Sequence, residues 1–314
     1  MESVTGPKSR RTQGMLLAGV TALISGFAVF LNGYGVRAWV EISDPTTYTT
    51  LKNSVAALIL FAVLATVGAR HGNQTARRLE SRRQWFGLAV VALLGGALPF
   101  VLFFEGLAIA SSVQAAFIHK TLVVWVAILA VSILREKTGP LQLVAIGLLV
   151  VGHAVLAGGL GAIELGMGEL LILAATLLWS VEVIIAKRLL SDISSHTLAV
   201  ARMGGGSVLL IGYTLLRGGF SGLSGIGWEH VIWILVTGLM LAGYVGTWFA
   251  ALSRAPAVDV TAVLVGGAII TALLRGVVAG AALPSPLGLG LICVGVLVIF
   301  LGSNRLRFPG LSSS

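Results

Sequence analysis

The sequence predicts an all-α polytopic membrane protein with ten transmembrane helices, arranged as two inverted five-helix repeats. Three observations carry this prediction. Of the 314 residues, 57% are hydrophobic and only 11% are charged, whereas a soluble domain has about 25% charged residues. Ten apolar segments each approach the roughly 20 residues that a membrane-spanning helix needs. Finally, one motif occurs twice, and the charges of its turn differ between the two copies.

The ten segments follow one another through short connections, as expected for a compact bundle. The first resembles a signal peptide, but its length and the lack of a small-residue cleavage site favour a retained helix. The predicted spans are 14–40, 46–69, 85–109, 111–134, 139–159, 167–189, 194–217, 228–252, 257–280 and 285–302. The predicted domains are a cytoplasmic tail (1–13), the first repeat (14–159), the second repeat (160–302) and a cytoplasmic C-terminal tail (303–314).

The repeated motif begins before the fourth helix of each half. In the first half, Ala110-Ser-Ser-Val-Gln-Ala leads into an apolar helix and then into the charged turn Arg135-Glu-Lys. In the second half, Ala255-Pro-Ala-Val-Asp-Val leads into an apolar helix and then into an uncharged turn at 281–284. Basic loops stay on the cytoplasmic side of a membrane. The second copy is therefore predicted to be inverted relative to the first.

The positions of the basic residues support this topology. Of the 21 Lys and Arg residues, 15 lie in the N-terminal tail, four loops and the C-terminal tail, all on one predicted side. Both termini are therefore predicted to be cytoplasmic, in a plasma (inner) membrane of the bacterial type. The net charge of +9 is then explained as a topology signal, and no nucleic-acid partner is expected.

The sequence gives no indication of an enzyme. It contains no P-loop, no His-Glu-x-x-His motif and no Gly-x-Ser-x-Gly nucleophile elbow. Five His residues and a single cysteine, Cys293, do not form a cluster with metal-ligand spacing. We therefore predict no enzymatic activity, no cofactor and no metal site, and the chain itself carries no site for ATP.

Several features together resemble the EamA-type family of the drug/metabolite transporter superfamily. They are the two five-helix repeats, a basic residue early in each second helix (Lys52 and Arg202), the Ala-x-Ala/Ser-Val turns, and Glu136-Lys-Thr-Gly-Pro before the fifth helix. The resemblance covers about residues 15 to 303, although the second repeat lacks an acidic counterpart of Glu136. It implies a secondary exporter of amino acids and related metabolites, with aromatic amino acids favoured where aromatic residues line the site.

Lys120 is the strongest candidate for substrate binding. It lies nine residues into its segment, about 13 Å deep at 1.5 Å per residue and thus near the midplane. His119 is adjacent and Gln114 lies about one and a half turns away. An ionisable residue inside a membrane needs a partner or water. Lys120 is therefore expected either to pair with a buried carboxylate or to face a wet cavity that receives an anionic group.

Glu182 and a set of aromatic residues complete the predicted site. Glu182 shares a helix face with Trp179, and it is expected to hold a substrate ammonium or exchange a proton, or else to form a salt bridge with Arg202 or Lys187. Trp248 is expected either in the pocket or in an interfacial aromatic belt. The predicted substrate-binding residues are Lys120, His119, Gln114, Glu182, Trp179, Asn32, Tyr34, Phe100, Phe103, Tyr244 and Trp248.

Five further charged residues are predicted to form gates or structural ion pairs: Glu105, Lys52, Arg202, Asp259 and Arg275. Glu105 is expected to act as a gate or as the partner of Arg275, and Asp259 is expected to cap its helix. Intramembrane His153 is expected to be a packing residue. The dense glycines, 41 in all, are expected to serve close packing or helix bending.

The predicted function is export of small amphipathic metabolites, above all aromatic or neutral amino acids, by alternating access around a midplane site between the repeats. Export of other metabolites or drugs, such as nucleosides or sugar derivatives, and lipid flipping are the alternatives. Proton coupling through Glu182 or His119 and facilitated diffusion both remain open. The expected partners are a small-molecule substrate and membrane lipids, and the chain is expected to be a monomer or a homodimer.

Overall fold

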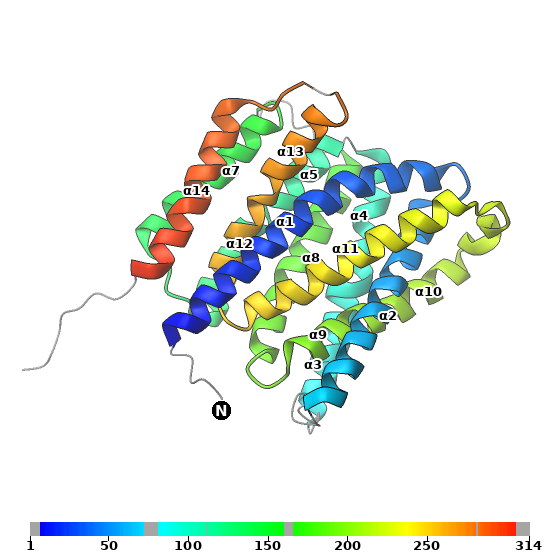
Figure 1. Ribbon diagram of the computed structural model, residues 1–314, viewed down its shortest axis with the longest axis horizontal. Helices are drawn as coiled ribbons and strands as arrows, with labels where there is room; N and C mark the ends of the chain where they lie inside the picture. The colour runs from blue at the N-terminus through cyan, green and yellow to red at the C-terminus, as the bar shows by residue number, and fades with distance from the viewer. Residues whose placement is uncertain (1–6, 72–80, 111, 160–165, 281, 306–314) are drawn as a thin grey trace, which may run out of the picture.

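The computed structural model describes residues 7–71, 81–110, 112–159, 166–280 and 282–305, and all regular secondary structure within these ranges is helical (Figure 1). The first half contains α1 (Pro7–Val40), α2 (Pro45–His71), α3 (Arg82–Val91), η2 (Ala92–Ala97), α4 (Leu98–Ile109), α5 (Ser112–Lys120), α6 (Leu122–Leu129), η3 (Ala130–Leu134) and α7 (Pro140–Leu156). The second half contains α8 (Met167–Leu189), α9 (Ser195–Val200), η5 (Ala201–Gly205), α10 (Gly206–Leu216), η6 (Gly219–Gly225), α11 (Trp228–Leu252), α12 (Ala257–Val265), α13 (Gly267–Val277) and α14 (Pro286–Arg305). Each predicted segment has a counterpart among these helices.

Side-chain caps explain why several of these helices begin where they do. The Asp44 carboxylate accepts hydrogen bonds from the backbone N–H groups of Thr46 (2.8 Å) and Thr47 (2.9 Å), and Pro45 opens α2. Ser81 forms a capping box with Gln84 at the start of α3. Such caps satisfy N–H groups that have no partner within the helix.

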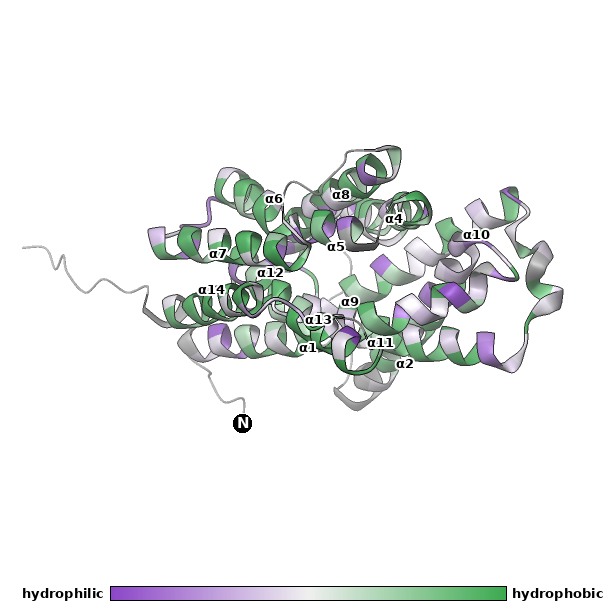
Figure 2. Cartoon of the chain, turned by 90° about the horizontal axis from the view of Figure 1, so that it is seen from above, coloured by the Kyte–Doolittle hydropathy of each residue, from purple (hydrophilic) through white to green (hydrophobic). Residues whose placement is uncertain are grey.

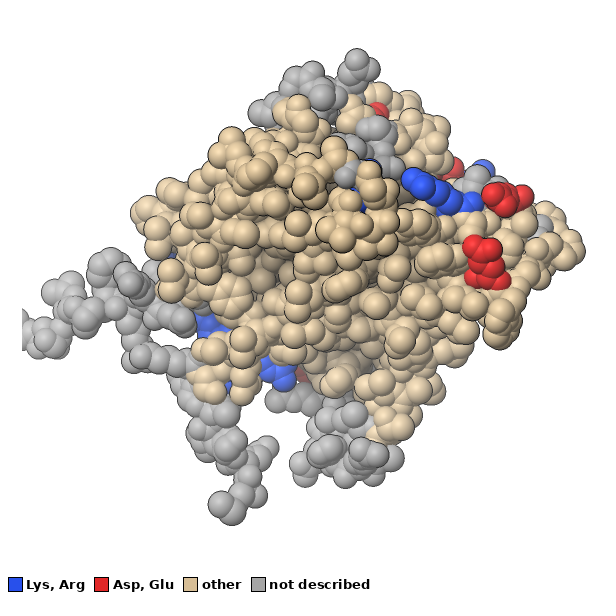
Figure 3. Space-filling view, turned by 45° about the horizontal axis from the view of Figure 1, so that its top comes forward, with Lys and Arg blue, Asp and Glu red and all other residues tan. Residues whose placement is uncertain are grey.

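The helices form an integral membrane bundle. Eight of them, within the described ranges, are long and apolar enough to cross a membrane, and Pro140–Leu156 and Pro286–Gly302 are shorter apolar helices. Apolar residues predominate along α6, α7, α12 and α14 (Figure 2). On the face seen in Figure 3, charged side chains gather at two opposite ends with a broad uncharged belt between them. The count of ten spans stays a prediction.

The two halves are packed together through several pairs of helices. Helix α1 lies beside α11, and α7 lies beside α14 at one edge of the bundle (Figure 1). The close approach of α7 and α14 depends on glycine, because a Cβ at Gly152 would lie 2.9 Å from side-chain atoms of Ile292. The start of α1 and the end of α14 lie on the same side of the bundle.

The fourth helix of each half is discontinuous. The predicted single helix 111–134 breaks at Thr121 between α5 and α6, and 257–280 breaks at Gly266 between α12 and α13. Aligning Ala110 with Ala255 offsets the two halves by 145 residues, and the same offset places Thr121 on Gly266. The two halves therefore share this break as well as the sequence motif.

Two π-helical turns meet where the third helix of the first half crosses the second helix of the other half. These turns, η2 and η5, are in contact. A Cβ on Gly206 would lie 2.5 Å from backbone atoms of Gly96, so the two backbones touch. Here the glycines serve close packing. π-Helical turns are rare in proteins, and those that occur are often found at functional sites. These two turns lie next to the central cavity between the halves.

Candidate functional site

A central cavity of about 420 Å³ lies between the two halves. Helices α1, α2, α4, α5 and α6 contribute to its lining, as do α8, η5, α11 and α12. Its lining is mostly apolar, with a few charged side chains. Nine of the eleven predicted substrate-binding residues line it: Asn32, Phe100, Phe103, His119, Lys120, Trp179, Glu182, Tyr244 and Trp248.

Lys120 lines the cavity beside the break between α5 and α6. Within the described part of the chain, no carboxylate pairs with it. One backbone feature makes this position suitable for a cation. The C-terminal end of α5 is the negative end of its dipole and favours the ammonium group.

Aromatic rings surround the position next to Lys120. The ring of His119 lies 5.0 Å from Trp179 and 5.4 Å from Phe103. Phe100 meets Trp179 edge-on at 5.4 Å. The Trp179 indole N–H donates to the carbonyl of Gly95 in η2 (3.1 Å), which fixes the ring. This wall suits a planar or aliphatic group of a solute.

Trp248 belongs to the cavity and not to an interfacial belt. It is buried, with 4% of its surface exposed, and it stacks on Tyr244 at 6.2 Å. Both rings line the cavity.

Glu182 and Arg202 form the salt bridge that was one of the two predictions for Glu182. The Arg202 Nε and the Glu182 carboxylate are 3.4 Å apart, and both side chains are buried. The guanidinium also lies 5.9 Å from the rings of Phe100 and Phe249. The pair faces the cavity, so a solute would meet a carboxylate whose charge is already balanced.

Lys52 lines the same cavity and is 4% exposed. Its Nζ donates to the side-chain oxygen of Asn32 (2.9 Å) and lies 4.5 Å from the centre of the Phe104 ring. The Asn32 oxygen also accepts from the Tyr48 hydroxyl (3.2 Å), and its amide N–H donates to the Ala28 carbonyl. Both ends of the Asn32 amide are thus used within the protein, although Asn32 is one of the predicted substrate-binding residues.

Two predicted substrate residues lie outside the cavity lining. Tyr34 packs against Phe30 at 5.2 Å and stacks on Trp233 at 6.1 Å. Gln114 lies on α5 and does not line the cavity. Intramembrane His153 stacks on Phe117 at 6.0 Å, as expected for a packing residue.

Three predicted gate residues have different partners from those expected. Glu105 pairs with Arg217 and not with Arg275, which is exposed at the end of α13 without an ion pair among the described residues. Asp259 does not cap α12; its carboxylate accepts from Arg11 (2.6 Å) and Gln142 (2.5 Å). The sequence could not give these pairings, because each joins residues more than 100 positions apart.

Some cavity features were not anticipated. Phe104 and Thr237 line the cavity, and Thr237 accepts a hydrogen bond from Tyr48 (2.8 Å). Tyr48 precedes Lys52 by four positions, one helical turn, so its contact with the lysine was visible in the spacing. The contacts of Phe104 and Thr237 depend on how the helices pack.

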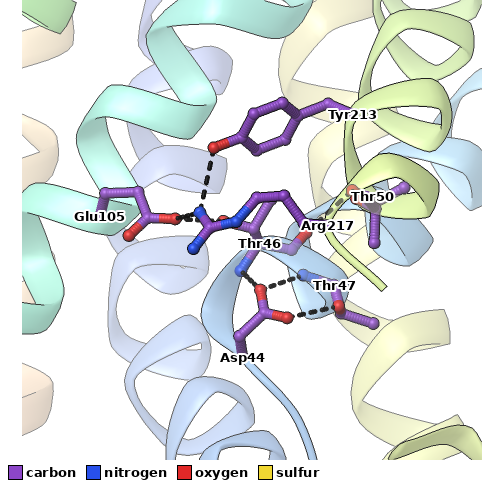
Figure 4. Close-up of polar contacts among 8 residues, drawn as sticks. Asp44, Thr46, Thr47, Thr50, Glu105, Tyr213 and Arg217 are labelled. Carbon is purple, nitrogen blue, oxygen red and sulfur yellow. Dashed lines mark hydrogen bonds and ion pairs between the residues drawn. The ribbon is translucent and has the colours of Figure 1, made fainter. Parts of the chain in front are cut away.

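One end of the bundle, here named the acidic end, contains the turn between α1 and α2 with Glu41 and Asp44, Glu105 of α4, and Glu229 at the start of α11. There Arg217 at the end of α10 donates to Glu105 of α4 (2.5 Å) and to the Tyr213 hydroxyl (3.0 Å). Thr46 of α2 also donates to Glu105 (3.3 Å). Figure 4 shows this cluster joining three helices. Because both partners of the ion pair are exposed, it contributes little to stability.

The opposite end, here named the basic end, contains the start of α1, the turn before α7, the end of α8 and the turn after α11, which carry Arg11, Arg135, Lys187, Arg188 and Arg254. Its interactions converge on the turn between α11 and α12, residues 253–256. The two oxygens of Glu136 accept from the N–H groups of Ala257 (2.9 Å) and Val258 (3.2 Å). Lys187 donates to the carbonyls of Leu252 (2.5 Å) and Ala255 (2.7 Å). The turn is thus held by charged groups from α8 and from the turn before α7.

These contacts close the cavity toward the basic end. Its lining there stops at Trp248 and Thr261, about one turn from the end of α11 and the start of α12. Along α1 the lining continues to exposed Arg37, three residues before the helix ends. The cavity therefore extends toward the acidic end.

Replacing Glu136 with alanine should open the basic end more often. The loss of a helix cap costs about 1–2 kcal/mol, which corresponds to roughly a tenfold change in a conformational equilibrium. In a Cys293→Ser background, a cysteine at cavity-lining Thr261 should react about tenfold faster with a thiol reagent supplied at the basic end. Lys137→Ala, in the same turn and exposed, is the matched control. Equal rates in both variants would remove Glu136 from the closure.

Comparison with known proteins identifies the family. Residues 12–158 and 166–301 each match the EamA-like transporter family, so the two halves are two copies of one repeat. No curated protein matches the chain. A solved structure described only as a crystal structure of a protein has a TM-score of 0.75 and 17% sequence identity, covering 95% of this chain and 99% of its own; at that identity the likeness shows the fold alone. The chain belongs to the EamA-like transporter family, whose members are membrane transporters of small solutes.

Proposed function

We propose that this transporter exports small amphipathic metabolites that carry a carboxylate, in particular aromatic or neutral amino acids. The observation that carries the proposal is Lys120, a cavity-lining cation without a carboxylate partner among the described residues. A solute carboxylate would bind the ammonium group. The side chain of the solute would contact Phe103, His119 and Trp179.

Alternating access around this cavity is the proposed mechanism. With the basic end cytoplasmic, as the positive-inside rule predicts, the cavity extends toward the outside in this conformation. Opening to the cytoplasm requires release of the α11–α12 turn from Glu136 and Lys187. The aligned breaks at Thr121 and Gly266 support a rocking motion, because a discontinuous helix bends there at lower cost.

Flux measurements in proteoliposomes test the substrate class. Vesicles would be loaded with phenylalanine, leucine or alanine, with glucose and uridine as controls, at two pH gradients. We expect flux of the amino acids, and we expect Lys120→Ala to lower it by about 100-fold, because loss of a hydrogen bond to a charged group together with the ion pair costs about 3 kcal/mol.

Lys137→Ala is the matched control, since it removes an exposed lysine from the basic end and should leave flux unchanged. Dependence of the flux on the pH gradient would establish proton coupling, and independence would establish facilitated diffusion. Flux of uridine or glucose without any amino-acid flux would contradict the proposed substrate class.

A further inference from the structure

The charged residues that line the cavity do not balance. The lining contains one carboxylate, Glu182, and four cationic side chains: Arg37, Lys52, Lys120 and Arg202. The lining therefore has an excess of three positive charges. Arg202 is paired with Glu182. Cavities with walls of low dielectric constant concentrate the field of such charges. The cavity is therefore more favourable for an anion than for a neutral zwitterion.

Lys52 is the buried cation that the proposed function leaves without a role. It has three N–H donors, and among the described residues only the Asn32 oxygen accepts from it. Its other neighbours are the rings of Phe104 (4.5 Å) and Tyr48 (5.2 Å). Aromatic faces offset part of the cost of burying a cation, but they do not neutralise its charge.

A row of aromatic rings leads from Lys52 to the residue next to Lys120. Phe104, which contacts Lys52, lies 5.5 Å from Phe103, and Phe103 lies 5.4 Å from His119, the residue before Lys120. The two lysines come from different helices, α2 and α5, and both line the cavity. A solute whose apolar part rests on these rings therefore lies in the cavity that both lysines line.

We propose that Lys52 is a second anion-binding residue, so that the transporter prefers solutes with a net negative charge over neutral solutes of the same size. This inference rests on the proposed function, because it takes Lys120 as the site of the first carboxylate. The preferred class is organic acids with an apolar body that either lack an amine or carry a second carboxylate. Such a solute supplies the negative charge that the lining lacks.

Two pairs of solutes that differ by one charge test the proposal. Phenylpyruvate and phenylalanine differ in the amine, and glutamate and glutamine differ in the second carboxylate. In proteoliposomes, the anionic member of each pair should compete for transport at least tenfold better than the neutral member. Lys52→Met should abolish this difference while the neutral members are still transported, and Lys52→Arg should keep it.

Asn32→Asp provides an independent variant in case Lys52→Met does not fold. It places a carboxylate within reach of the Lys52 ammonium group, 2.9 Å from the present oxygen, and so should abolish the preference without removing the lysine. Lys137→Met, at the exposed basic end, should keep the preference. An anion preference that survives both Lys52→Met and Asn32→Asp overturns the role of Lys52, as does equal competition by all four solutes in the unaltered protein. If none of the four is transported, the proposed function fails instead.

Discussion

Replacing Gly206 with alanine should destabilise the transporter by about 3 kcal/mol, the upper part of the range for an overpacked site. The added methyl group would lie 2.5 Å from the backbone atoms of Gly96. No side-chain rotation relieves this contact, because the obstructing atoms belong to the backbone of η2. The helices must separate, and the neighbouring Glu182–Arg202 pair must shift with them, since a Cβ on Gly95 would touch both side chains.

Gly212→Ala, six residues further along α10, is the matched control. A Cβ at Gly212 meets nothing within 4 Å, and alanine favours a helix by about 1 kcal/mol relative to glycine. The two substitutions should therefore have opposite signs in thermal unfolding followed by size-exclusion chromatography. Equal thermal stability of Gly206→Ala and the unaltered protein would show that the contact between the two backbones yields easily.

Replacing Glu182 with alanine should cost about 3–5 kcal/mol, the penalty for leaving one member of a buried ion pair without its partner. Arg202 is 6% exposed and has no other carboxylate partner among the described residues. The double variant Glu182→Ala, Arg202→Met removes both charges and should regain most of the lost stability, because no charge is then left buried without its partner.

The exposed pair at the acidic end supplies the comparison. Glu105→Ala breaks an ion pair whose side chains are 39% and 56% exposed, so it should cost less than about 1 kcal/mol. Thermal unfolding of the three variants measures the difference. A double variant that is no more stable than Glu182→Ala would mean that Glu182 stabilises the fold through contacts other than Arg202.

These two predictions separate packing from electrostatics at one location. Gly206 and Gly96 bring η2 and η5 together, and the Glu182–Arg202 pair lies against the same crossing. Changes here should affect both stability and solute binding, whereas Lys120 and Lys52 should affect chiefly the solute.

Sequence patterns predicted the positions of the helices well, because the physical causes are local. Apolar length, the charges of the loops and the repeated motif are all properties of short segments. The same local information missed the breaks at Thr121 and Gly266, since an apolar stretch reads as one helix whether or not its backbone hydrogen bonds continue.

The candidate site was predictable only in part. A lysine near the membrane midplane is costly unless it faces a cavity or a partner, so depth alone pointed to Lys120. The partners of Glu105 and Asp259 could not be read in this way, because several cations lie at similar depths and only packing selects among them.

By itself, the sequence determined a membrane protein made of two related helical halves with a deep, charged centre, because burial of apolar residues in lipid and the cost of burying charge act residue by residue. Only the tertiary structure decided which charges are neutralised. Arg202 met Glu182, and Arg217 met Glu105, while Lys52 and Lys120 both reached the cavity without a carboxylate among the described residues. The physical reason is that Coulomb interactions depend on distances between helices, and those distances follow from packing across the whole bundle.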